Sequence, residues 1–252
     1  MKKSFYERTA HKRKVTLFSY PRSGSNWVAY CIEKISGLVV IGSDGHIGDI
    51  AVENRLEIDP KALVHKSHGG KMVLDWFTSN TTQEGLLLVI RNYKEAILRD
   101  AGNKPKYPVF HPINDMKPSL QGINNPTDSP DYLSMIQNYD SYNGPKLLID
   151  YDNFILNIEN ELKKLGEWLV QFGGAYNEII LNKFMEDIEH HKKFSMSRYK
   201  NMHGKTATDG NPKKLKIQKE TWLTDKTERE IDEYVKKQDK IIYEKYLKKY
   251  KL

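Results

Sequence analysis

Residues 20–27 (Tyr-Pro-Arg-Ser-Gly-Ser-Asn-Trp) combine chemical groups that bind an anion. Gly24 lets the backbone approach a ligand closely, and Arg22 adds a fixed positive charge on a planar fork. Three further side chains can donate hydrogen bonds: Ser23, Ser25 and Asn26. If a helix begins here, its first backbone N–H groups lack helical partners and carry partial positive charge. The segment therefore predicts a phosphate cradle, with an ordinary strand-to-helix turn as the plainer alternative.

This loop must lie between a strand and a helix to work in that way. Apolar β-prone runs predict strands at 15–20, 62–64, 86–90 and 146–149. Apolar residues at helical spacing predict helices at 27–35, 155–169, 177–190 and 225–247. Strands alternating with helices predict an α/β fold: a P-loop-like three-layer α/β/α domain with a central parallel sheet. We expect one domain over residues 1–252, with 100–130 as a long loop that forms a lid over a pocket.

Several charged side chains follow the predicted strands directly. Arg22 follows the first strand, Lys66 and His68 follow the second, and Arg91 follows the third. In open parallel sheets, ligands bind in the crevice outside the carboxyl ends of the strands. We therefore expect these four side chains to share one crevice.

Residues 20–27 resemble the Tyr-Pro-Lys-Ser-Gly-Thr-x-Trp loop of sulfotransferases that use 3′-phosphoadenosine-5′-phosphosulfate (PAPS). The resemblance implies that this loop and its helix, over residues 15–36, bind the 5′-phosphosulfate of the donor. It assigns donor binding to Arg22, Ser23, Gly24, Ser25 and Asn26, with Arg22 in place of the usual lysine. By the same resemblance Trp27 stacks on the adenine, although its place on an apolar helix face is equally consistent with core packing.

A second resemblance covers residues 86–99. The segment Leu-Val-Ile-Arg-Asn-Tyr-Lys-Glu at 88–95 is similar to the family's strand followed by Arg-Asn-Pro-Lys-Asp. It implies that Arg91 binds the 3′-phosphate of the donor. Arg99 stands where the family commonly has a serine for the same phosphate, and an arginine can bind that anion too. Tyr151 with Asp152 resembles a Tyr-Glu-Asp segment that lies near the adenosine.

A third resemblance assigns the catalytic groups. Lys66-Ser-His68 is similar to the family's Lys-Thr-His segment, which implies that His68 is the general base and that Lys66 contacts the sulfuryl group. An imidazole can accept the proton of a weak alcohol nucleophile as the new bond to sulfur forms. Arg22 and Lys66 can stabilise the negative charge that builds on the leaving phosphate. We therefore expect direct in-line transfer without a metal. A structural role for His68 is the alternative.

The remaining site predictions fall on loops. The family closes its donor site with a late Arg-Lys-Gly segment, for which this chain offers Arg198 with Lys200, or Gly204 with Lys205. Gly204 and Lys205 have the better spacing, and a mobile basic loop is the alternative. Three residues in the 100–130 loop are candidates to line the acceptor site: Tyr107, Phe110 and His111. The acceptor itself, a small molecule or a glycan with a hydroxyl or an amine, is not specified by these residues.

Composition limits the competing functions. The 252 residues carry 40 basic against 33 acidic side chains, a net charge of +7 that favours an anionic partner without requiring nucleic acid. One cysteine and the lack of a long apolar run predict a cytoplasmic protein without a membrane span. A kinase or hydrolase with a degenerate phosphate loop is the main alternative, although Gly-x-x-x-x-Gly-Lys-Ser/Thr is absent. A basic nucleic-acid-binding protein is a third possibility, and the oligomeric state is open.

Overall fold

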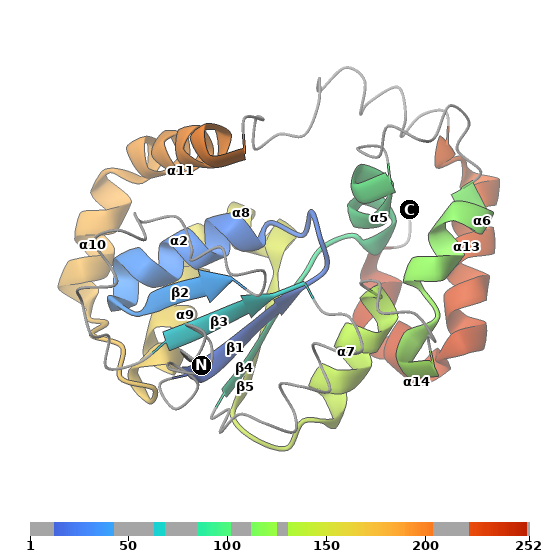
Figure 1. The fold of residues 1–252 in the computed structure, drawn as a ribbon, viewed down its shortest axis with the longest axis horizontal. Coiled ribbons are helices and arrows are strands. Elements are labelled where there is room, and N and C mark those ends of the chain that lie inside the picture. Colours follow the sequence, from blue (N-terminus) through green and yellow to red (C-terminus); the bar gives the residue numbers. More distant parts are fainter. Residues whose placement is uncertain are drawn as a thin grey trace, which may run out of the picture.

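The computed structural model describes residues 13–42, 63–68, 85–101, 112–124, 131–203 and 222–250. Its centre is a five-stranded sheet in which every pairing is parallel (Figure 1). The strands, in the spatial order β2-β3-β1-β4-β5, are β1 (Arg13–Ser19), β2 (Val39–Gly42), β3 (Leu63–Ser67), β4 (Gly85–Ile90) and β5 (Lys146–Asp150). Four of them were predicted. The missed strand, β2, is a short β-branched run directly after a helix.

Helices cover both faces of this sheet, so the predicted three-layer α/β/α architecture is confirmed. Every residue of β4 is buried, and its side chains alternate between two cores. One core is shared with α2 (Ser25–Ser36), α9 (Ile158–Val170) and α10 (Glu178–Glu186). The other is shared with α5 (Tyr93–Ala101), α7 (Tyr132–Ser141) and α13 (Asp225–Gln238). Burial on both faces explains the unbroken apolar run of β4.

The structure corrects three predicted helices. The predicted helix 155–169 is two helices, α8 (Tyr151–Leu156) and α9, separated at Asn157, whose backbone is not helical. The predicted helix 177–190 divides at Asp187 into α10 and α11 (Ile188–His203). The last helix ends at Gln238, because the carboxylate of Asp239 accepts the N–H of Ile242 and starts a new helix. The residues after Asp239 form three short helical elements: α14 (Lys240–Ile242), η4 (Tyr243–Leu247) and η5 (Lys248–Tyr250).

The prediction of a long loop over 100–130 is wrong for its described part. Residues 112–124 form α6 (Pro112–Met116), η2 (Lys117–Ser119) and η3 (Gly122–Asn124). The buried carboxylate of Asp131 accepts backbone N–H groups from Gln121 at 2.9 Å and Gly122 at 3.1 Å. Met116 and Leu120 are buried in the core. Side-chain capping and two apolar anchors therefore order a segment whose composition is typical of loops.

Helix α5 is fixed to the C-terminal helix α13 by a buried charge cluster. The Lys94 side chain is only 1% exposed, and its Nζ lies 3.2 Å from Glu228 and 2.9 Å from Asp232. The Tyr93 hydroxyl also donates to Asp232, and burial together with this carboxylate raises the pKa of Tyr93. These contacts immobilise the first turn of α5, directly after Arg91.

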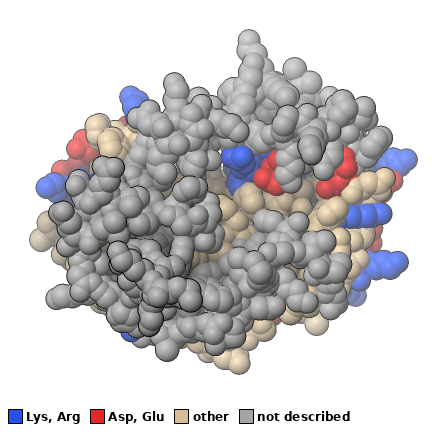
Figure 2. Space-filling model, in the orientation of Figure 1, with Lys and Arg blue, Asp and Glu red and all other residues tan. Residues whose placement is uncertain are grey.

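Basic and acidic side chains are mixed on the surface. On the face in Figure 2, the described Lys and Arg side chains lie among Asp and Glu. Several described lysines form ion pairs, such as Lys245 with Asp140 at 2.5 Å and Lys248 with Glu244 at 2.8 Å. None of the helices described here has the length and apolarity to cross a membrane.

Candidate functional site

A cavity of about 530 Å³ opens at the carboxyl ends of the strands. The chain leaves β1 through α2 on one face of the sheet and leaves neighbouring β4 through α5 on the other face. This reversal creates a crevice between the two strand ends, where ligands bind in open α/β sheets. Arg22 after β1, His68 after β3, Arg91 after β4 and Tyr151 after β5 all line the cavity. The structure therefore brings together side chains from four adjacent strand ends.

The loop after β1 has an unusual backbone. Arg22 has a φ of 70°, the only positive φ found for a non-glycine residue in the described ranges, and Gly24 has a φ of 86°. The left-handed conformation costs an L-residue about 1–2 kcal/mol, and such strain concentrates at functional sites. The Gly24 carbonyl accepts the N–H groups of Trp27 at 3.0 Å and Val28 at 3.2 Å, which starts α2. The helix N-terminus therefore opens at the cavity, where it favours an anion.

Tyr151 packs directly on this loop. A Cβ at Gly24 would lie 2.1 Å from Cε2 of Tyr151, so only glycine leaves space for the ring. The guanidinium carbon of Arg91 lies 5.5 Å from the centre of the same ring, within cation–π range. Burial raises the pKa of the Tyr151 hydroxyl, which the charge of Arg91 opposes. The ring thus connects the loop after β1 to the loop after β4.

Arg91 is held from several sides. Its Nη2 lies 3.3 Å from Glu95 Oε1, and its Nε lies 3.5 Å from Asp152 Oδ1. Its backbone N–H donates to the Tyr132 hydroxyl at 3.0 Å, and that hydroxyl donates to the Arg91 carbonyl at 2.5 Å. The next residue, Asn92, caps α5 by accepting the N–H of Lys94 at 3.1 Å. The guanidinium is therefore presented to the cavity from a rigid base.

Arg99 joins Arg91 through the same carboxylate. Its Nη2 lies 2.6 Å, and its Nε 3.0 Å, from Glu95 Oε1. Arg91 precedes α5, Glu95 lies in its first turn and Arg99 in its last turn, and the four-residue spacing places the three side chains on one side of the helix. Both arginines line the cavity.

The His68 ring is held by Ser19 through Nδ1. Its Nδ1 lies 3.0 Å from the backbone carbonyl of Ser19 and 3.3 Å from the Ser19 hydroxyl. A carbonyl oxygen can only accept, so the proton of the neutral ring is on Nδ1 and the lone pair is on Nε2. A neutral imidazole of this tautomer can take a proton at Nε2.

Two predicted site residues do not line the cavity. Lys66 Nζ donates to Asn26 Oδ1 and thereby fixes a side chain that does line it. Ser23 is fully buried, and its hydroxyl has no hydrogen-bond partner within the described part of the chain. The other described predictions all line the cavity: Arg22, Gly24, Ser25, Asn26, Trp27, His68, Arg91, Arg99 and Tyr151.

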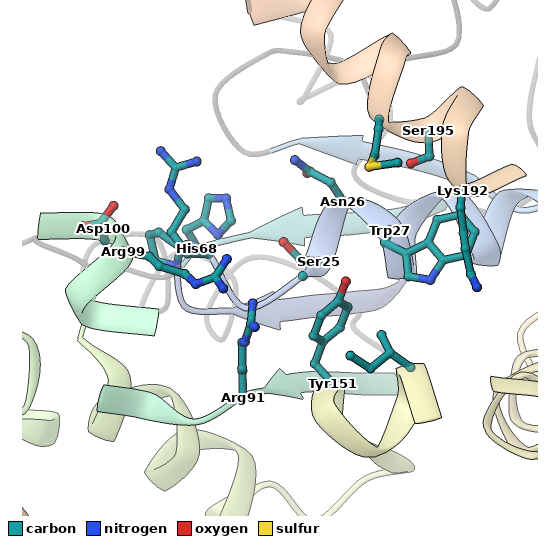
Figure 3. A pocket seen from close by; sticks show the side chains of 15 residues that line it. Ser25, Asn26, Trp27, His68, Arg91, Arg99, Asp100, Tyr151, Lys192 and Ser195 are labelled. Carbon is teal, nitrogen blue, oxygen red and sulfur yellow. The ribbon is translucent and has the colours of Figure 1, made fainter. Parts of the chain in front are cut away.

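The cavity has two differing ends (Figure 3). His68, Arg99 and Asp100 gather at one end, whereas Trp27, Lys192 and Ser195 gather at the other. Trp27 borders the cavity and also stacks on Tyr30 with ring centres 5.6 Å apart, while its predicted contact with the adenine stays a prediction. Sequence reasoning missed several lining residues: Asp100, Ile155, Lys192, Ser195 and Met196. The last three recur at helical spacing on α11, which indicates a common face but not what that face covers.

Other predictions fall outside the described residues. Gly204 and Lys205 lie there, as do the acceptor-site candidates Tyr107, Phe110 and His111. Arg198 and Lys200 belong to α11, whose side chains are described only as far as residue 197. These positions remain predictions.

Comparison with known proteins finds likeness in structure but no match in sequence. No protein-family model matches the chain, and neither does any curated protein. Among solved structures, the crystal structure of mouse sulfotransferase SULT7A1 complexed with PAP matches 71% of this chain, at 21% identity and a TM-score of 0.47. The match spans 63% of that protein, less than two thirds of its length. A likeness at this level assigns neither a family nor an activity.

Proposed function

We propose that this protein is a sulfotransferase that moves a sulfuryl group from PAPS to a hydroxyl or an amine of a small molecule or glycan. One observation carries the proposal: Arg22, Arg91 and His68, which reach the site from three neighbouring strand ends, line a single cavity. A nucleotide with phosphates at both ends of its ribose needs two cationic subsites, and the transfer needs a base beside one of them. The motif resemblances of the loops after β1, β3 and β4 support the same assignment.

The donor is bound by its two phosphate ends. The 5′-phosphosulfate lies at the start of α2, where backbone N–H groups, Ser25 and Arg22 meet it. The 3′-phosphate lies against Arg91 and Arg99. The adenine lies at the end of the cavity that Trp27 borders, beneath α11. A cavity of about 530 Å³ is within the usual range of roughly 300–1,000 Å³ for small-molecule sites.

The transfer itself is a direct displacement at sulfur. The acceptor oxygen or nitrogen forms a bond to sulfur and gives its proton to Nε2 of His68. The bond between sulfur and the bridging phosphate oxygen breaks, and 3′-phosphoadenosine-5′-phosphate (PAP) leaves with the electron pair. Arg22 and the loop amides stabilise the charge that grows on that oxygen. Lys66 acts through Asn26, which it holds beside the reacting centre.

A turnover assay with matched histidine variants tests this proposal. PAP release from PAPS is measured against a panel of phenols, monosaccharides and alkylamines, for the wild type, His68→Ala and His190→Ala. We expect His68→Ala to lower turnover by about 10²–10⁴-fold, the usual contribution of a general base, and to leave the affinity for PAP unchanged. The exposed His190 is the control and should retain activity. Full activity of His68→Ala would overturn the base assignment, and magnesium-dependent ATP hydrolysis without PAPS turnover would favour a kinase or hydrolase instead.

A further inference from the structure

Arg91 and Arg99 share one nearly buried carboxylate. Glu95 Oε1 accepts from Nη2 of Arg91 at 3.3 Å and from Nη2 of Arg99 at 2.6 Å. The Glu95 side chain is 12% exposed and does not line the cavity, whereas both arginines do. Two guanidinium groups that contact the same oxygen are close enough to bind one phosphoryl group together (Figure 3).

We propose that Glu95 is a positioning residue that holds the guanidinium groups of Arg91 and Arg99 side by side, so that both contact the 3′-phosphate. This arrangement makes the site selective for 3′-phosphorylated nucleotides. This inference rests on the proposed function. Side chains of arginine lose much rotamer freedom when they bind a ligand. Because the Glu95 carboxylate already fixes both guanidinium groups, less conformational entropy is lost when the nucleotide binds.

The charge of Glu95 makes this inference sharply testable. If Glu95 merely lies near the site, its negative charge repels the nucleotide, and neutralising it strengthens binding. If Glu95 positions the two arginines, neutralising it weakens binding in spite of the gain in positive charge. The two readings predict changes of opposite sign for the same substitution.

The experiment compares PAP with AMP, which lacks the 3′-phosphate, by calorimetry on the full chain. We expect Glu95→Gln to weaken PAP binding by about tenfold and to change AMP binding by less than about twofold. Glu244→Gln, which also removes a carboxylate from an i,i+4 ion pair, is the matched charge control and should change neither affinity. A general loss of stability would lower both affinities, so the ratio of PAP to AMP affinity isolates positioning.

Arg99→Lys supplies an independent second variant. It keeps the positive charge but removes the fork that contacts Glu95 through two nitrogens. The PAP-to-AMP ratio should fall as in Glu95→Gln, and combining the two changes should add little further loss. Unchanged or tighter PAP binding by Glu95→Gln, or an unchanged ratio in Arg99→Lys, would overturn the inference. Failure of the wild type to bind PAP would instead overturn the proposed function, and this inference with it.

Discussion

The contact between Gly24 and Tyr151 allows a quantitative test of how the loop after β1 is built. Alanine at position 24 would have to adopt a φ near 86°, and its Cβ would lie 2.1–2.4 Å from three atoms of the Tyr151 ring. The left-handed backbone costs about 1–2 kcal/mol, and overpacking of this kind costs about 1–3 kcal/mol. We therefore expect Gly24→Ala to lower the free energy of unfolding by about 2–5 kcal/mol.

The other end of the same helix provides the matched control. Gly37 also has a positive φ, of 67°, but nothing lies within 4 Å of its Cβ position. Gly37→Ala should therefore show the backbone cost alone, about 1–2 kcal/mol. The difference between the two variants measures the clash with Tyr151.

Urea denaturation gives both free energies, and calorimetry with PAP reports the effect on the site. A double-mutant cycle of Gly24→Ala with Tyr151→Ala measures the steric part of this cost. In the Tyr151→Ala background, we expect Gly24→Ala to lower the free energy of unfolding by no more than Gly37→Ala does in the wild type. PAP affinity should fall in Gly24→Ala because the displaced ring also contacts Arg91. Equal stabilities of the Gly24→Ala and Gly37→Ala variants, with unchanged PAP binding, would refute this account of the loop.

Two further predictions concern stability away from the loop. Lys94→Met leaves Glu228 and Asp232 as buried carboxylates without their cation, so it should lower the free energy of unfolding by about 3–5 kcal/mol in urea denaturation. Lys163→Met removes an exposed ion pair and should lower it by less than about 1 kcal/mol. Burial lowers the pKa of His191 below its ordinary 6.5, so the unfolded chain binds the proton more readily and stability should fall as pH drops below 6.5. The fall should be smaller in His191→Gln, and an identical pH dependence would contradict this assignment.

Local sequence patterns were sufficient for the parts of the site that follow strands. The apolar run at 15–20 predicts β1, and the helical spacing of apolar residues at 27–35 predicts α2. The loop at 20–24 between them follows without any information on tertiary contacts. Because parallel strands end at the same edge, the convergence of Arg22, His68 and Arg91 followed from their positions alone. The four-residue spacing of Arg91, Glu95 and Arg99 also favours contact between their side chains, although the motif resemblance assigns no role to Glu95.

The remaining features depend on packing between distant segments. Nothing local indicates that α11 borders the cavity with Lys192 and Met196, because that depends on how a helix packs beside α2. The break at Asn157 was missed because the apolar period continues across it. The order in residues 112–124 comes from Asp131, a residue beyond the segment itself. The hydrophobic period and the composition are properties of one segment, whereas these three features depend on the distant residues that the segment packs against.

The central claim is that one cavity binds both phosphates of a 3′,5′-bisphosphorylated adenosine. Calorimetric titration with PAP tests it most directly, on the wild type, Arg22→Ala, Arg91→Ala and the exposed control Arg229→Ala. We predict a micromolar dissociation constant for the wild type and the control, and a loss of at least about tenfold for each cavity variant. Absence of PAP binding by the wild type, or wild-type affinity in both Arg22→Ala and Arg91→Ala, would contradict the claim.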